Sequence, residues 1–265
     1  MIKRYISVLL CALILISVCG CADKTKEENK LPSLPPMGED GIATVLIDPG
    51  HGFGDVGCIS EYLGDVYEHH LTMDFAKRLE KMLHGLGYNV LFTHDGENIP
   101  NMAEVSAEAY SLGVDFEAER VTAQNNIFDA YERTVYANVL AKKTEIDLFF
   151  SIHVNANADT NTAEGFEIDY CAENESTEMS SFAFDAICAR LEAAYPERRL
   201  KKFADTWDMS FVVNKYTAVP SILFETAYAS TATEAELLMD ESWRESLMQT
   251  IADGIADYFS LKFGE

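Results

Sequence analysis

The chain has few basic residues. Its 265 residues include 20 Lys and Arg but 44 Asp and Glu, which gives a formal net charge of −24. A surface this acidic repels the phosphate backbone of nucleic acids and the headgroups of anionic lipids. We therefore expect no nucleic-acid partner and no membrane attachment by charge alone.

Long apolar runs are scarce as well. One run covers residues 6–18 after two basic residues; it is too short to span a bilayer but suits the core of a signal peptide. It ends in Val18-Cys19-Gly20-Cys21, which resembles the bacterial lipobox. We expect residues 1–20 to be a lipoprotein signal peptide and Cys21 to carry the lipid; the alternative is an ordinary cleaved signal. The lipid would anchor the exported protein to the outer face of the cytoplasmic membrane, or hold it in the periplasm or at an outer membrane.

The stretch after the leader has almost no large apolar residues. Residues 21–40 are rich in Lys, Glu, Asn, Pro and Ser, so they cannot bury a core and should form a disordered tether. Residues 41–265 are long enough for one substantial domain. This domain contains Cys58, Cys171 and Cys188 without the spacing of a metal site; one disulfide is possible, but free, mostly buried thiols are favoured.

Beyond the tether, segments in which apolar residues have the spacing of a strand alternate with segments in which they have the spacing of a helix. Strands are predicted at residues 45–47, 88–93, 148–153, 165–170, 211–213 and 221–224, and helices at residues 66–85, 130–145, 176–194 and 242–262. Strands that alternate with helices of this length predict an α/β fold, in which a single domain has a mostly parallel, twisted sheet with helices on both faces.

One segment does not fit this alternation. Residues 96–130 are rich in Glu and Ala and show no strand pattern. A connection this long in a compact domain is usually functional or disordered. We expect an inserted, partly helical cap near the functional site, and an activator protein as a partner if this segment covers the site.

Three apolar strands end in side chains that bind metals or protons. His51 follows the first strand, His153 ends a second, and Glu225 ends a third. The carboxyl ends of the strands in an open α/β sheet form the edge where ligands bind. A lone histidine beside a strand is more often structural. Glu225 is harder to explain in that way, because an unpaired carboxylate on an apolar strand is unfavourable by several kcal/mol or has a shifted pKa.

Glu68 has two interpretations. It lies three residues after an aspartate at the start of a predicted helix, and this local spacing favours a helix cap. Alternatively, Glu68 joins His51 and His153 in a set of two nitrogens and one oxygen, which is typical of a catalytic zinc site with an open position for water. Glu225 would then be the general base.

Five motifs, taken in order, resemble a known family. They are Asp48-Pro49-Gly50-His51-Gly52, Glu68, Glu132-Arg133, Ser151-Ile152-His153-Val154-Asn155 and Phe224-Glu225-Thr226, between about Thr44 and Phe259. This pattern is similar to the Amidase_3 family of zinc-dependent N-acetylmuramoyl-L-alanine amidases. The resemblance implies Zn²⁺ on His51, Glu68 and His153. It further implies Glu225 as the catalytic base and peptidoglycan as the substrate, and it reverses the local preference for a helix cap.

Some positions differ from the family pattern. Phe53 stands where the family has a second glycine, Thr93-His94 stands where it commonly has Thr-Arg, and Ala227-Tyr228 replaces Gly-Phe. These differences concern the fine shape of the pocket and remove no ligand. Asn155 is equally open to a contact with the substrate peptide and to a structural role at the end of its strand.

Two other functions stay open. The first is a zinc peptidase that cuts the stem peptide of peptidoglycan, and the second is a non-catalytic, wall-binding lipoprotein of the same fold. His69 or His70 could also compete with Glu68 as a ligand, although no His-Glu-x-x-His pattern is present. The presence of the three expected zinc ligands and of Glu225 argues against the non-catalytic alternative.

Overall fold

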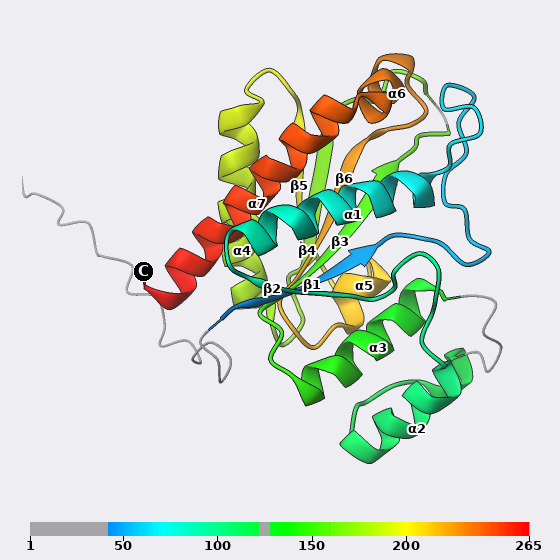
Figure 1. Ribbon diagram of the computed structural model, residues 1–265, viewed down its shortest axis with the longest axis vertical. Coiled ribbons are helices and arrows are strands. Elements are labelled where there is room, and N and C mark those ends of the chain that lie inside the picture. Colours follow the sequence, from blue (N-terminus) through cyan, green and yellow to red (C-terminus); the bar gives the residue numbers. More distant parts are fainter. Residues whose placement is uncertain (1–41, 122–127, 159, 265) are drawn as a thin grey trace, which may run out of the picture. The chain divides into compact units, whose positions relative to one another are not determined.

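The computed structural model describes residues 42–121, 128–158 and 160–264. These residues form a six-stranded sheet in the order β2-β1-β3-β6-β4-β5 (Figure 1). The strands are β1 (Thr44–Pro49), β2 (Asn89–Phe92), β3 (Leu148–Asn155), β4 (Phe166–Cys171), β5 (Leu200–Asp205) and β6 (Ser221–Tyr228). The first three and β6 are parallel, and β4 is antiparallel to β6 but parallel to β5. The predicted α/β fold with a mostly parallel sheet is confirmed.

Both faces of the sheet carry helices. On one face, α1 (Glu68–Gly85), α4 (Thr177–Ala194) and α7 (Glu241–Phe263) pack in one apolar core with alternate strand residues such as Ile47, Phe150 and Phe224. On the other face, α3 (Ala130–Lys143) and the short α5 (Val212–Tyr216) cover Leu46, Phe149 and Leu223. The short helix α6 (Ala232–Met239) connects β6 to α7. Because successive side chains of a strand point to opposite faces of the sheet, adjacent strand residues pack in two different cores.

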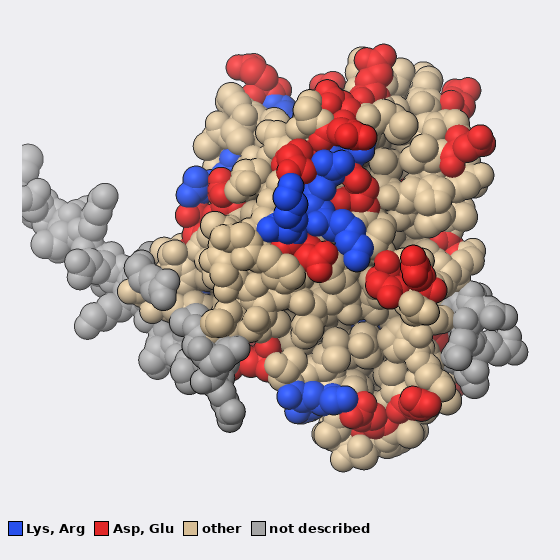
Figure 2. Space-filling model, in the orientation of Figure 1, with Lys and Arg blue, Asp and Glu red and all other residues tan. Residues whose placement is uncertain are grey.

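Ion pairs join two of the helices on the first face. Arg78 of α1 donates to Asp74 of the same helix at 2.8 Å and to Glu245 of α7 at 2.8 Å. Arg244 of α7 donates back to Asp74 at 2.6 Å. Figure 2 shows basic side chains, with acidic side chains around them, gathered over the region where α1 and α7 lie in Figure 1. The pairs hold α1, whose first residue belongs to the site, against α7.

Three elements differ from the sequence prediction. The predicted strand at residues 211–213 is wrong, since Val212–Tyr216 is the helix α5. Its Asn214 is buried and donates to the backbone carbonyl of Asp169 at 3.0 Å, a contact that no local pattern reveals. Strand β5 and helix α6 were not predicted. Because β5 is a half-exposed edge strand with two lysines, it lacks the apolar alternation of a strand and depends on its pairing with β4.

The inserted segment is partly helical where the structure describes it. Helix α2 (Met102–Leu112) and a 3₁₀ turn (Ala118–Arg120) precede α3, and α2 buries Met102, Val105 and Ala109 in an apolar cluster with α3. Residues 122–127 lie outside the described part of the chain. The idea that this segment covers the site therefore stays a prediction.

Other predictions also concern residues outside the described part. The signal peptide, Cys21 and the tether at residues 21–40 all belong to this group. Within residues 42–121, 128–158 and 160–264, no helix combines the length and the apolar character needed to cross a membrane. Cys58, Cys171 and Cys188 are free thiols in the structure.

Candidate metal centre

His51 lies on the loop that follows β1. Its backbone is in the left-handed region, with φ of 67°, and the loop closes through a bridge between Gly52 and Asp55. The Nδ1 atom of His51 is 2.7 Å from Oδ2 of Asp55, whose other oxygen accepts the backbone N–H of Gly57 at 3.0 Å. A carboxylate on one ring nitrogen orients the other nitrogen as a metal ligand. The loop therefore presents Nε2 of His51 to the interior of the site.

Glu68 is the first residue of α1 and is only 3% exposed. Its Oε2 accepts the backbone N–H of Cys58 at 2.7 Å, and its Oε1 accepts the backbone N–H of Val154 at 2.9 Å. The carboxylate is thus held by the loop before α1 and by β3. It does not cap its own helix, so the local interpretation of Glu68 as a helix cap is wrong.

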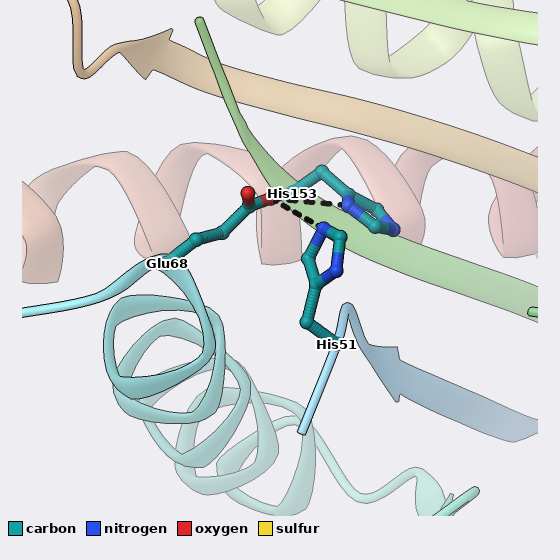
Figure 3. A group of neighbouring side chains, drawn as sticks. All are labelled: His51, Glu68 and His153. Atoms are coloured by element: carbon teal, nitrogen blue, oxygen red, sulfur yellow. Dashed lines mark hydrogen bonds and ion pairs between the residues drawn. The ribbon is translucent and has the colours of Figure 1, made fainter. Parts of the chain in front are cut away.

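His153, on β3, completes a group of three side chains (Figure 3). Oε1 of Glu68 is 3.1 Å from Nε2 of His51 and 3.1 Å from Nδ1 of His153. One nitrogen or oxygen atom from each residue lies within 4.8 Å of the others. The two imidazole rings meet edge to face, with 4.9 Å between their centroids. Three side chains from a loop, a helix and a strand therefore converge on one point.

The three groups also shift one another's protonation. Burial alone would raise the pKa of the Glu68 carboxyl, but hydrogen bonds and charge from His153 and His51 hold it far below its usual value. Burial alone would lower the pKa of His51, but Glu68 and Asp55 raise it. A carboxylate that stays ionised between two imidazoles is the electrostatic arrangement expected of ligands gathered for a cation.

Two glycines leave the space that these side chains occupy. A Cβ atom on Gly50 would lie 2.4 to 2.6 Å from three ring atoms of His153. A Cβ atom on Gly57 would lie 2.6 Å from both Cβ and Oε2 of Glu68, and its φ of +71° is unfavourable for other residues. The close packing of backbone against ligand explains glycine at both positions.

A buried carboxylate supports the strands beneath the group. Asp48, at the end of β1, accepts hydrogen bonds from Arg133, Ser151 and Thr93, each at 2.7 Å. Burial would raise the pKa of Asp48, but Arg133 and the two hydroxyls lower it. The contacts tie β1 to β3, to α3 and to the end of β2. Although Asp48 and Arg133 belong to recognised motifs, the sequence does not reveal this pair, because the residues lie 85 positions apart.

Glu225 lies on β6, and its Cα is opposite that of His153 in the sheet. Paired residues place their side chains on the same face, so Glu225 flanks the group of three. Its Oε2 is buried and has no hydrogen-bond partner in the described part of the chain. Burial, with the charges of Glu68, Asp169 and Glu167, raises the pKa of Glu225 well above its usual value. This carboxyl therefore takes up a proton more readily than an ordinary glutamate does.

Asn155 has a partner of its own within the protein. Its Nδ2 donates to Oε2 of Glu167 on β4 at 2.7 Å. The other oxygen of Glu167 contacts Lys201 of β5 and the hydroxyl of Tyr228. Asn155 is thus part of a polar cluster beside Glu225, not of the group of three. The sequence did not indicate that Glu167 and Lys201 belong to this cluster, because a single charged residue in a short strand forms no recognisable motif.

The fold and this group define a class of protein. The two histidines come from the loop after β1 and from β3, the glutamate comes from the start of α1, and the half-buried Glu225 lies beside them on β6. Two imidazole nitrogens and a carboxylate oxygen are a donor set that recurs in metal-dependent hydrolases. The sequence profile of Amidase_3, described as N-acetylmuramoyl-L-alanine amidase, matches residues 45–257. The chain belongs to this family.

Named relatives agree with this assignment. The chain is 30% identical over 240 residues to N-acetylmuramoyl-L-alanine amidase LytC of Bacillus subtilis (strain 168), covering 90% of this chain and 39% of LytC. It is 26% identical over 254 residues to N-acetylmuramoyl-L-alanine amidase AmiC of Neisseria meningitidis serogroup B, covering 91% of this chain and 58% of AmiC. The chain therefore spans only part of the length of these relatives.

Solved structures show the same fold. An N-acetylmuramoyl-L-alanine amidase from Clostridium difficile 630 superposes with a TM-score of 0.62 at 22% identity, covering 83% of this chain and 97% of that one. The CwlD amidase from Clostridioides difficile, solved in complex with the GerS lipoprotein, superposes with a TM-score of 0.60 at 21% identity, covering 82% and 98%. At this level of identity, the similarity establishes the architecture alone.

Proposed function

We propose that this protein is a zinc-dependent N-acetylmuramoyl-L-alanine amidase. Its substrate would be peptidoglycan, and the bond cleaved would be the amide between N-acetylmuramic acid and the L-alanine of the stem peptide. The observation that carries the proposal is the convergence of His51, Glu68 and His153 within 4.8 Å in a chain of the Amidase_3 family. LytC and AmiC, which carry this activity in their names, support the choice of bond.

The three side chains fit a zinc ion. Their donor atoms are two imidazole nitrogens and one carboxylate oxygen, a set that recurs in catalytic zinc sites. Nε2 of His51 is oriented by Asp55, and Glu68 is held by two backbone N–H groups. A zinc ion held by three protein groups lowers the pKa of a coordinated water to about 7 and polarises a carbonyl.

Glu225 would move the proton in this reaction. Its buried, unpartnered oxygen accepts a proton from the water that attacks the lactyl carbonyl carbon. The carbon–nitrogen bond then breaks, and Glu225 delivers the same proton to the nitrogen of L-alanine. This second transfer is required, because an amide anion is too basic to leave. The raised pKa of Glu225 makes this carboxylate a stronger proton acceptor than an ordinary glutamate.

The same proposal places the protein outside the cytoplasm. The expected lipid on Cys21 and the tether at residues 21–40 would hold the catalytic domain at a membrane surface facing the cell wall. Relatives named as probable cell wall amidases LytH, such as that of Staphylococcus epidermidis at 23% identity, support this location. The complex of CwlD with the GerS lipoprotein supports an activator protein as a partner if residues 96–130 cover the site.

A digest of peptidoglycan tests the proposed reaction. Purified sacculi are incubated with the zinc-loaded protein, with and without a chelator, and the soluble products are analysed by mass spectrometry. We expect intact glycan and free peptides that begin with L-alanine, and no release when the chelator is present. Peptides cut within the stem would instead identify a peptidase, and no release under any condition would favour a non-catalytic role.

Two variants separate the metal from the base. Glu225→Gln should keep one equivalent of zinc by elemental analysis while hydrolysis falls about 10³-fold, because the proton acceptor is lost. His153→Ala should lose the zinc itself. Near-normal turnover by Glu225→Gln would contradict its role as the base.

A further inference from the structure

A row of four paired residues crosses the sheet from the group of three. Along β3, β6, β4 and β5, the backbone register pairs His153 with Glu225, Glu225 with Glu167, and Glu167 with Lys201. Paired residues place their side chains on the same face, so Glu225 lies between His153 and Glu167. Because neighbouring strands are about 4.8 Å apart, the backbone of Glu167 lies about 10 Å from that of His153, across an intervening strand. Glu167 is therefore a neighbour of Glu225 and not a further ligand of the metal centre.

Both oxygens of the Glu167 carboxylate are bound within the protein. Oε2 accepts the Nδ2–H of Asn155 on β3 at 2.7 Å. Oε1 accepts from the amine of Lys201 on β5 and from the hydroxyl of Tyr228 on β6, and this amine also contacts this hydroxyl. A carboxylate held on both oxygens by an ion pair and two hydrogen bonds is poorly placed to carry a proton in the reaction. Instead, Glu167 ties β3, β5 and β6 to its own strand, β4.

Strand β6 is irregular where Glu167 holds it. His153 pairs with Glu225, but the pair that follows joins Asn155 to Tyr228, so β3 advances by two residues while β6 advances by three. An extra residue of this kind bends the strand that contains it and re-aims the neighbouring side chains. The direction of the Glu225 side chain, at the start of this stretch, therefore depends on how the stretch is held.

The irregular stretch is held at both ends. Near its start, the hydroxyl of Thr226 donates to the backbone carbonyl of His153 at 3.1 Å. At its end, the carboxylate of Glu167 binds both members of the closing pair, Asn155 and Tyr228. The Oε2 atom of Glu225 itself has no hydrogen-bond partner among the residues that the structure describes. No side chain fixes this oxygen directly, so its position follows from the backbone of β6.

We propose that Glu167 is a positioning residue, which aims the carboxylate of Glu225 at the group of three by fixing the end of the irregular stretch. The inference rests on the proposed function, in which Glu225 moves the proton. Tyr228 is one of the positions at which this chain differs from the family pattern, where phenylalanine is usual. The hydroxyl that Tyr228 offers to Glu167 is therefore a feature of this sequence.

The kinetics of Glu167→Gln test the positioning role. The variant keeps the size of the side chain but removes the charge that binds Lys201. In the full-length, zinc-loaded protein, kcat for release of peptides that begin with L-alanine should fall about 10- to 100-fold, because the base is misplaced. KM and the Kd for zinc should not change. The matched control is Glu192→Gln, which removes an ion pair between α4 and Lys202 of β5 and should keep the wild-type kcat.

A double variant separates positioning from general damage. Glu167→Gln is combined with Glu225→Gln, in which the base is already absent. If Glu167 acts through Glu225, the added substitution should change the residual rate by less than about twofold. An equal fall in kcat in both backgrounds would show that Glu167 supports the fold in general, and would overturn the positioning role.

Tyr228→Phe provides a second variant if Glu167→Gln does not fold. It keeps the ring and removes only the hydroxyl that Glu167 accepts. Because one hydrogen bond of several is lost, kcat should fall by about threefold, and again only when Glu225 is present.

Crystal structures of the zinc-bound wild type and of Glu167→Gln make the test independent of hydrolysis. We expect the Glu225 carboxylate to move by about 1 Å or more relative to the group of three in the variant. An unmoved Glu225, or a wild-type kcat in folded Glu167→Gln, would overturn the positioning role and leave the amidase proposal standing. If the wild type hydrolyses no peptidoglycan, the amidase proposal fails; a displaced Glu225 would then still support the structural role of Glu167, and an unmoved one would refute both.

Discussion

The substitution Gly50→Ala tests the proposal that His153 holds a zinc ion. The backbone at Gly50 is held on both sides, since its N–H donates to the carbonyl of Ile152 at 2.9 Å and its carbonyl accepts the hydroxyl of Thr72 at 2.7 Å. The added Cβ would lie 2.4 Å from Cε1 of His153 and 2.6 Å from both ring nitrogens. Because the backbone cannot retreat easily, the His153 ring must move.

The size of the movement follows from the contact distance. Carbon atoms reach favourable contact at about 3.5 Å, so the ring must shift by about 1 Å. Metal sites tolerate deviations of only about 0.2 Å in ligand distance. A misplaced ligand of this kind should weaken zinc binding at least as much as the loss of an orienting partner, which is about 10- to 100-fold.

Zinc-dependent stabilisation measures this effect. At a free zinc concentration of about 100 times the wild-type Kd, bound zinc stabilises the wild-type protein by about 2.7 kcal/mol. A variant with a Kd about 100-fold weaker gains only about 0.4 kcal/mol under the same conditions. Denaturation with and without zinc, together with chelator competition, gives both values. The control is Gly85→Ala at the end of α1, where the added Cβ would meet no atom within 4 Å apart from its chain neighbours and the backbone of its own helix.

One result would refute the reasoning. If folded Gly50→Ala bound zinc with the wild-type Kd, the ring of His153 would not need its present position to hold the metal. The assignment of His153 as a ligand would then have to be withdrawn. Gly85→Ala should bind zinc normally in either case, and any loss there would show that the assay reports general stability.

Arg133→Leu should destabilise the protein by about 3–5 kcal/mol in urea denaturation, because it leaves the buried charge of Asp48 without its cation. The control is Arg190→Leu, which removes an exposed ion pair with Asp257 and should change stability by less than about 1 kcal/mol. Because the pKa of Asp48 is lower in the folded protein than its ordinary 3.8, its stabilisation is present above that value and is lost as the pH falls through the folded pKa. Acid titration of stability should show this loss, and Asp48→Asn should remove it. Asn155→Ala should lower stability by about 1 kcal/mol through its bond to Glu167 without changing KM; a raised KM would indicate a substrate contact instead.

Local patterns in the sequence predicted most of the architecture. The apolar spacing along residues 66–85 predicted α1, which begins at Glu68, and the β-rich apolar runs predicted β1, β3 and β6. Parallel strands of one sheet bring their carboxyl ends to one edge, so these patterns also predicted that His51, His153 and Glu225 lie near one another. The structure places them in that way.

Local patterns failed where distant contacts decide the conformation. Phe211-Val212-Val213 has the composition of a strand, but Val213 and Asn214 are buried against the sheet as part of helix α5. Strand β5 has no strand pattern and exists because β4 offers it a partner. Propensity is a weak preference that tertiary contacts override.

The sequence by itself determined the order of most strands and helices and the residues at the ends of β1, β3 and β6, because these depend on the periodicity of neighbouring side chains. Only the tertiary structure decided how Glu68 is used, since the N–H groups that hold its carboxylate come from Cys58 and from Val154, 86 positions away. It likewise decided the partner of Asp48 and the cavity that Phe53 and His94 line together with residues of α1. Such contacts form between segments that meet only when the chain has folded, and no local pattern of residues encodes them.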